Sequence, residues 1–256
     1  TMETRNLIAG RWTDISSSGS IEVVDPASDK VIARVPMCGA SEALSALNSA
    51  FEFQPEWEAT PPAQRAAVLH ATAKLLVARK DSLARIITQE CGKPLAEAAG
   101  EVQYSADYFS CAANEMHALN EMQVALDRPG VRGVVRHRAV GVCAAITPWN
   151  FPLAIFTGQI AAALAAGNAV IAKPAESTGL IAARAVAHLH AAGVPTSALQ
   201  LLPGAGGIVG KAITSDARIN GVCFTGSTIT AQYINRAMAE NLSPSAPLIA
   251  ETGGLN

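Results

Sequence analysis

The sequence has few charged residues, few aromatic residues and no long runs of basic residues. Charged residues make up 16% of the chain and aromatic residues 5%, whereas 50% are hydrophobic, so the composition excludes a disordered chain. Lysines and arginines stand singly rather than in runs, and the formal net charge is −2. Because nucleic acids and anionic membranes attract dense basic patches, neither is an expected partner.

The cysteines lack the spacing of a disulfide framework or of a zinc site. There are five of them, an odd number without a C-x-x-C pair, namely Cys38, Cys91, Cys111, Cys143 and Cys223. A chain of 256 residues can bury a large core and needs no disulfide staples. We therefore expect free thiols, no metal site and a reducing, cytoplasmic compartment.

No hydrophobic run continues long enough to cross a bilayer. Residues 151–172 come closest, but a proline, two glycines, Gln159 and Asn168 interrupt them. About 20 uninterrupted apolar residues are needed for a membrane-spanning helix. The interrupted pattern favours a buried helix, a turn and a buried strand instead.

The first part of the chain, to about residue 120, is predicted to be mainly helical. Apolar residues recur at helical spacing over residues 40–53, 68–87 and 97–119. Thr60 is the expected N-cap of the second helix, with Pro61 at its first position, where the missing N–H costs nothing. Two short pieces, residues 7–13 and 21–24, are expected to make a small hairpin. Residues 131–140 have the composition of an extended arm.

From Gly141 onward, short apolar strands alternate with helices. The expected strands are residues 142–147, 169–172, 199–202, 221–224 and 248–250. The expected helices are residues 153–166, 178–192, 207–214 and 228–239, and Gly193 suits the left-handed position after the second of them. Such strands predict an α/β fold with a Rossmann-like parallel sheet, helices on both faces, and a helical N-terminal segment before it.

Polar residues follow the first two of these strands, where ligands of parallel sheets bind. Asn150 stands between Pro148 and Pro152, which suits a fixed amide donor for an oxyanion, or else it caps the next helix. Lys173 and Glu176 can reach the hydroxyls of a ribose, where Glu176 would repel a 2′-phosphate. Their alternative is a surface ion pair.

The three remaining strand ends carry glycines, hydroxyls and a carboxylate. Residues 203–207 and Gly210 allow a flat base to approach the backbone, or form a plain turn against a helix. Ser227 opens a helix whose free N–H groups favour a pyrophosphate, or it simply caps that helix. Glu251 can serve as a general base, or is a solvated loop carboxylate. Five candidates in succession predict one shared crevice for a dinucleotide.

Four motifs in this order make the sequence resemble one family over essentially its whole length. They are Ile146-Thr147-Pro148-Trp149-Asn150-Phe151-Pro152, Ala166-Gly167-Asn168 through Lys173-Pro174-Ala175-Glu176, Phe224-Thr225-Gly226-Ser227-Thr228, and Glu251-Thr252-Gly253-Gly254. With them the sequence resembles the aldehyde dehydrogenase family. The resemblance implies a NAD-binding domain over residues 1–256, with part of an oligomerisation arm near residues 123–140, and a homo-oligomer at full length.

The resemblance also implies a role for residues at every strand end. Asn150 would be the oxyanion-hole amide and Glu251 the general base that activates water. Lys173 and Glu176 would bind the adenosine ribose, and Glu176 favours NAD over NADP. The other implied cofactor-binding residues are Thr147, Pro148, Trp149, Gly204, Gly206, Gly210, Phe224, Gly226, Ser227 and Thr252.

In the family reaction a cysteine thiolate attacks an aldehyde, hydride passes to the cofactor, and water releases the acid from a thioester. The resemblance places that cysteine a few dozen residues beyond Glu251, in a catalytic domain outside this chain. The five cysteines present are not expected to replace it, so the chain alone should bind cofactor without oxidising aldehydes. The alternative is a catalytically silent nucleotide-binding or interaction module with the same fold.

Two subfamilies share features with different parts of the chain. Residues 156–159, with Gln159 where most members have Lys, and residues 199–204 and 247–256 resemble the pyrroline-5-carboxylate (glutamate semialdehyde) dehydrogenase module of bifunctional proline-utilisation enzymes. Residues 86–95 are closer to succinate semialdehyde dehydrogenases. Both resemblances imply a short aldehyde substrate that carries a distal carboxylate.

Overall fold

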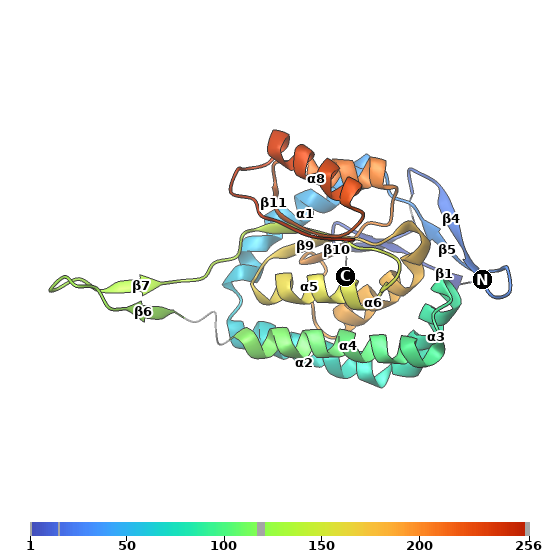
Figure 1. Ribbon diagram of the computed structural model, residues 1–256, viewed down its shortest axis with the longest axis horizontal. Coiled ribbons are helices and arrows are strands. Elements are labelled where there is room, and N and C mark those ends of the chain that lie inside the picture. Colours follow the sequence, from blue (N-terminus) through green and yellow to red (C-terminus); the bar gives the residue numbers. More distant parts are fainter. Residues whose placement is uncertain (1, 15, 117–120, 254–256) are drawn as a thin grey trace.

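Five parallel strands form the centre of the structure (Figure 1), a computed structural model that describes residues 2–14, 16–116 and 121–253. They are β8 (Val142–Ile146), β9 (Ala169–Lys173), β10 (Leu199–Leu201), β11 (Ile219–Gly226) and β12 (Leu248–Thr252). Their order is β12-β11-β8-β9-β10. Because the chain adds β9 and β10 on one side of β8 and then β11 and β12 on the other, the order reverses at β8.

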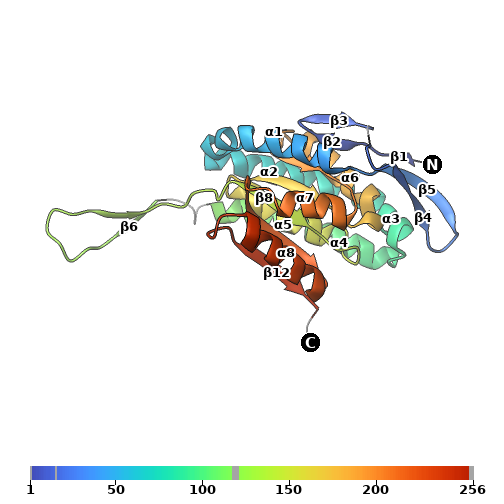
Figure 2. The same ribbon diagram turned by 90° about the horizontal axis from the view of Figure 1, so that it is seen from above.

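Helices cover both faces of this sheet, which confirms the predicted α/β class (Figures 1 and 2). The helices α5 (Ala154–Ala165) and α6 (Gly179–Ala191) lie on one face. The helices α1 (Ala40–Ala59), α7 (Lys211–Thr214) and α8 (Thr228–Asn241) lie on the other. Gly193 has a φ of 110°, so the predicted left-handed position is confirmed. No helix among the described residues has the length and apolar character needed to cross a membrane.

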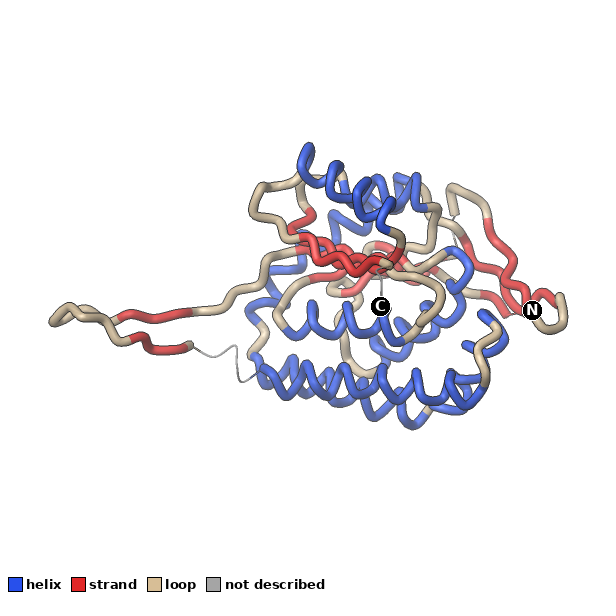
Figure 3. The backbone as a smooth tube through the Cα atoms, in the orientation of Figure 1, coloured by secondary structure: helices blue, strands red, loops and turns tan. Residues whose placement is uncertain are grey.

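A second helical layer packs beneath α5 and α6 (Figure 3). It consists of α2 (Pro62–Ala78), α3 (Lys80–Cys91) and α4 (Leu95–Asn114). The prediction for Thr60 is wrong, because α1 continues to Ala59 and the Thr60 hydroxyl donates to the Glu56 carbonyl at 3.0 Å, ending that helix. Pro62, not Pro61, is the first residue of α2. The end of the predicted helix 97–119 falls on residues 117–119, outside the described residues.

The N-terminal strands form two hairpins rather than the single one predicted. β2 (Asn6–Ile8) turns at Ala9 and Gly10, both at positive φ, and pairs with β3 (Arg11–Thr13). This hairpin extends the central sheet beside β10. Residues 21–24 lie in β4 (Ser20–Asp25), which pairs with β5 (Lys30–Pro36), and β1 (Met2–Glu3) completes a separate three-stranded sheet.

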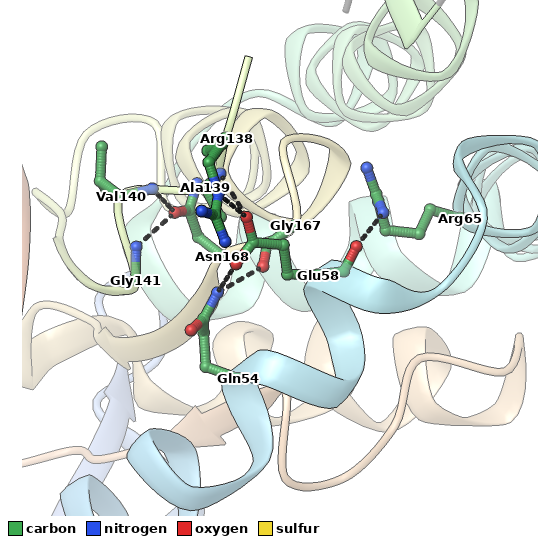
Figure 4. A network of polar contacts seen from close by, with 9 residues as sticks. All are labelled: Gln54, Glu58, Arg65, Arg138, Ala139, Val140, Gly141, Gly167 and Asn168. Carbon is green, nitrogen blue, oxygen red and sulfur yellow. Dashed lines mark hydrogen bonds and ion pairs between the residues drawn. The ribbon is translucent and has the colours of Figure 1, made fainter. Parts of the chain in front are cut away.

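The predicted extended arm is confirmed as a two-stranded ribbon. β6 (Met122–Val124) and β7 (Gly133–Val135) pair antiparallel and project far from the rest of the molecule (Figures 1 and 2). The root of the ribbon is tied to the body (Figure 4): the Glu58 carboxylate accepts from the Ala139 N–H at 3.2 Å, and the Asn168 Oδ1 accepts from the Val140 N–H at 2.8 Å.

Candidate functional site

A large cavity opens where the carboxyl ends of β8 and β9 meet. Its volume is about 1080 Å³, and Trp149, Lys173 and Glu176 line it from the strand side. Thr230 and Tyr233 of α8 line it from the opposite side. The cavity therefore lies at the point where the strand order reverses, which is the place where ligands bind in sheets of this kind.

Lys173 and Glu176 place a donor and an acceptor on one wall of the cavity. Lys173 is only 5% exposed, and its Nζ donates to the Pro174 carbonyl at 3.1 Å. Burial lowers the pKa of Lys173, and the charge of Glu176 partly offsets this. No ion pair joins the two side chains in the described part of the chain, so the surface ion-pair alternative is wrong. Glu176 Oε1 instead accepts from the Gly206 N–H at 3.3 Å.

Three glycines after β10 give the cavity an open, flat border. A Cβ atom added at Gly206 or Gly207 would have no neighbour within 4 Å. At Gly210 it would meet only the Lys173 side chain, at 4.0 Å. All three residues line the cavity, so this backbone leaves room for a planar ligand.

Two other glycines of the motifs are explained by packing within the protein. A Cβ at Gly204 would lie 2.3 Å from Val209 Cγ2 and 3.0 Å from the Cys38 carbonyl oxygen. A Cβ at Gly226 would lie 2.6 Å from the ring of Phe224, which is itself buried. Tight packing therefore accounts for both glycines. The cofactor contacts of Gly204, Phe224 and Gly226 remain predictions.

The loop after β8 carries Asn150 to the surface of the sheet edge. Asn150 does not cap the helix that follows, since the N-cap of α5 is Leu153. The Leu153 and Ala154 N–H groups instead donate to Glu101 Oε1 at 2.9 and 3.1 Å. The capping alternative for Asn150 is therefore wrong, and within the described residues no hydrogen bond engages its side chain.

Thr147 and Pro148 hold the start of this loop. Thr147 is buried, and its N–H donates to the Lys173 carbonyl at 3.2 Å. Its hydroxyl is buried without a partner in the described residues. Pro148 is half-buried, whereas the neighbouring Trp149 is 58% exposed. The chain thus brings the Trp149 indole ring to the cavity, while Thr147 stays inside the protein.

Ser227 is the N-cap of α8, as one of the two alternatives predicted. Its Oγ accepts from the Thr230 N–H at 3.1 Å and lies 2.8 Å from the Thr230 hydroxyl. Thr230 lines the cavity. Ser227 does not line it but is hydrogen-bonded to Thr230. Ser227 satisfies one of the first N–H groups of α8. The start of this helix still carries partial positive charge, which favours an anion near it.

Glu251 lies apart from Lys173, Glu176 and the open glycines. It lines a second cavity of about 750 Å³, on the face of the sheet that α5 covers, together with Gln159, Phe224 and Thr225. Gln159 Nε2 donates to Thr225 Oγ1 at 3.2 Å, and Thr225 is the register partner of Glu251. The expected single crevice is therefore wrong for Glu251, which faces the α5 side of the sheet because the side chains of a strand alternate between its two faces. Asn150 and Ser227 do not line the first cavity either. Thr252, the next residue, is exposed.

The thiols of the chain lack the surroundings of a nucleophile. Burial raises the pKa of Cys38 and of Cys143 to about 12, and it also raises the pKa of Cys91 and Cys223. Cys111 is exposed on α4. Reactive thiols need a lowered pKa, so these environments favour packing. No cluster of metal-binding side chains occurs among the residues that the structure describes.

Several cavity residues were missed from the sequence. Thr230, Tyr233, Ile234 and Ala237 line the cavity from one face of α8. Their spacing is that of a helix face, and the helix starts directly after a strand end, which was the available signal. Lys211 and Arg236 also line the cavity and bring positive charge to it.

Comparison with known proteins agrees with this geometry. The model of the aldehyde dehydrogenase family matches residues 12–256. The chain is 46% identical over 238 residues to the bifunctional protein PutA of Klebsiella aerogenes, covering 91% of this chain and 17% of that protein. It is 36% identical over 235 residues to glutarate-semialdehyde dehydrogenase of Pseudomonas putida, covering 92% of this chain and 49% of that protein.

A solved structure repeats the fold almost completely. An NADP-dependent enzyme of Escherichia coli superposes with a TM-score of 0.94 at 34% identity, over 98% of this chain and 52% of that one. The chain thus spans about half the length of this enzyme and of the glutarate-semialdehyde dehydrogenase. By its sequence motifs, its sheet and its strand-end residues, the chain belongs to the aldehyde dehydrogenase family.

Proposed function

We propose that this chain is the NAD-binding part of an enzyme that oxidises a short semialdehyde to the carboxylic acid. The observation that carries the proposal is the cavity at the reversal point of the sheet. It combines a buried ammonium, a carboxylate and open glycine backbone at adjacent strand ends. A donor and an acceptor of this kind suit the hydroxyls of a ribose, and the open backbone suits a flat base.

The residues present fit the cofactor in this orientation. Lys173 would donate to the ribose hydroxyls and Glu176 would accept from them, and the open backbone at Gly206 and Gly207 would leave room for the base. The start of α8, a helix of 14 residues, and Trp149 would bind the pyrophosphate. NAD, when bound, accepts a hydride from the substrate. The carboxylate of Glu176 supports NAD over NADP by repelling a 2′-phosphate, although a structurally similar enzyme is NADP-dependent.

Asn150 and Glu251 are assigned the steps that involve the aldehyde oxygen and water. The Asn150 amide donates to the aldehyde oxygen as negative charge develops there. The Glu251 carboxylate takes a proton from the water that releases the acid. The raised pKa of four of the thiols argues against a nucleophile among them, and Cys111 lines neither cavity. Both observations support a chain that binds cofactor without oxidising aldehydes by itself.

The relatives support the substrate class that we propose. PutA and a glutarate-semialdehyde dehydrogenase are both similar to this chain over nine-tenths of its length. We assign as substrate a short aldehyde with a distal carboxylate, of the size of glutamate semialdehyde or succinate semialdehyde. Full-length protein is proposed to assemble as a homo-oligomer through the ribbon of β6 and β7.

Calorimetric titration of the chain with NAD tests the proposal. We expect saturable binding that Lys173→Met weakens, because the ribose loses its buried donor. Lys74→Met is the matched control, since Lys74 is an exposed lysine on α2. Absence of heat at millimolar NAD, or equal weakening by both substitutions, would count against the cavity as the cofactor site.

A further inference from the structure

The loop that carries Asn150, defined here as the Asn150 loop (residues 148–152), has few bonds of its own. Pro148 and Pro152 have no N–H to donate. Trp149 and Phe151 are 58% and 46% exposed, so burial holds only the end of the loop, at Pro152, and leaves both neighbours of Asn150 exposed. An amide that stabilises an oxyanion must be held within about 0.5 Å of its working position. The position of Asn150 therefore depends on what fixes the ends of this loop.

The end of the Asn150 loop is fixed by a carboxylate from the second helical layer. Glu101 lies on α4, and its side chain is 1% exposed. Its Oε1 accepts from the N–H groups of Leu153 and Ala154, at 2.9 and 3.1 Å. These are the first donors of α5, where the helix dipole favours a negative charge. Glu101 thus anchors the chain immediately after the loop.

A lysine joins this carboxylate to the loop itself. Lys93 lies in the short connection between α3 and α4, and its side chain is 12% exposed. Its Nζ forms an ion pair with Glu101 Oε2 and lies 3.8 Å from the centroid of the Phe151 ring. A cation over an aromatic ring is attracted to its face, more strongly when water is excluded. One ammonium group therefore contacts both the anchor and the neighbour of Asn150.

From these contacts we infer that Lys93 and Glu101 are positioning residues, which hold Asn150 where its amide can meet the oxygen of the substrate. The inference rests on the proposed role of Asn150. Neither residue touches the reacting atoms, so both act through the Asn150 loop. Misplacement of a catalytic group by ~1 Å costs about 10²-fold in rate. Loss of the pair should therefore slow the reaction more than it weakens the binding of NAD.

Fluorine NMR on the chain tests the positioning without any need for activity. The three tryptophans are labelled with 5-fluorotryptophan, and Trp149→Phe identifies the Trp149 resonance by its loss. We expect both Lys93→Met and Glu101→Gln to shift or broaden this resonance and to leave those of Trp12 and Trp57 in place. Lys93→Arg, which keeps the cation, should restore most of the native signal.

Glu90→Gln is the matched control. Glu90 is also a buried carboxylate of the second helical layer, and it accepts from the Leu180 and Ile181 N–H groups at 2.7 and 2.9 Å. It therefore makes the same kind of cap at another helix. A Trp149 resonance that is unchanged in both Lys93→Met and Glu101→Gln overturns the inference. So does an equal change in Glu90→Gln.

Rates in a full-length enzyme containing this chain separate the inference from the proposed function. We expect Lys93→Met and Glu101→Gln to lower kcat roughly ten- to a hundredfold, with a smaller change in the NAD dissociation constant. Asn150→Ala is measured alongside. If Asn150→Ala leaves kcat unchanged, the oxyanion role itself is wrong. If Asn150→Ala lowers kcat but neither substitution of the pair does, only the positioning role is wrong.

Discussion

Single carboxylates carry much of the chemistry proposed for this chain, and Glu176 is the one proposed to set the preference for NAD over NADP. Its Oε1 is 3.3 Å from the Gly206 N–H, at the wall assigned to the ribose. Glu176→Gln removes the charge and should narrow the preference for NAD over NADP by about 1–2 kcal/mol, roughly five- to thirtyfold. The ratio of the two dissociation constants measures this.

Glu240→Gln provides the control for that experiment. Glu240 is a carboxylate of α8 that lines the same cavity from the opposite side. Glu240→Gln should change the ratio of the NAD and NADP dissociation constants less than Glu176→Gln does, because the ribose is assigned to the opposite wall of the cavity. A ratio that Glu176→Gln leaves unchanged would remove Glu176 from the ribose site.

Glu251 should act only in the second half of the reaction. In a full-length enzyme, Glu251→Gln should leave the rapid formation of the first equivalent of NADH intact and slow later turnover about 10²- to 10⁴-fold. Stopped-flow absorbance separates the two phases. Glu22→Gln, at an exposed surface ion pair, is the control. Unchanged steady-state turnover would rule out Glu251 as the base.

At the scale of elements, the starts of α5 and α6 share one design. Each begins with two N–H groups that donate to a buried carboxylate of the second helical layer, Glu101 for α5 and Glu90 for α6. The residues that meet are 52 and 90 positions apart in sequence. Cap rules look only at neighbouring residues, so these contacts could not be predicted.

Glu90 should make the stability of the chain depend on pH. Burial raises the pKa of Glu90 to about 7, and its two backbone hydrogen bonds only partly offset this. The folded chain then binds the proton of Glu90 more tightly than the unfolded chain does. Protonated Glu90 therefore adds to the free energy of unfolding below pH ~4.5, and this contribution is lost as pH rises through about 7. Relative to the Glu90→Gln variant, the free energy of unfolding of the protein should fall by on the order of 3 kcal/mol over this pH range.

Urea midpoints measured at several pH values across that window test this expectation. The difference between the protein and Glu90→Gln should change steadily with pH and level off above about pH 8. Parallel curves for the two proteins would show that the Glu90 pKa is not displaced by burial.

The strands were easier to predict than the helix ends. The strands β8, β9 and β10 are wholly buried and almost entirely apolar apart from Lys173 and Gln200, and a short buried run of this kind is a strong signal for a parallel strand. The helix α1 was predicted too short because it continues through Pro55, a residue that usually ends a helix. Contacts made in the folded chain decided that boundary.

For the molecule as a whole, the sequence predicted the family and the sheet correctly but not the separation of the candidate residues over two faces. Motif order was enough for the family, which the match over residues 12–256 confirms. The face on which Glu251 lies depends on the register between β11 and β12, which pairs it with Thr225. Register was not predictable from short apolar strands.

The ribbon of β6 and β7 should mediate assembly at this scale. A two-stranded ribbon alone is marginally stable, and Val124 and Val135 are exposed on it. In the full-length protein, Val124→Asp combined with Val135→Asp should shift the assembly toward smaller species in light scattering. Val77→Asp, at an exposed valine of α2, is the control and should leave the mass unchanged. An unchanged mass in the double variant would exclude the ribbon from the interface.

The contacts of Glu90 and Glu101 with α5 and α6 limit how this protein can be truncated. The alternating strands and helices start at Gly141, so a minimal nucleotide-binding fragment would naturally be cut near residue 140. Such a fragment would leave the first turns of α5 and α6 without acceptors and would uncover their apolar undersides. The smallest fragment expected to fold therefore includes α3 and α4, although both precede the alternating strands and helices in the sequence.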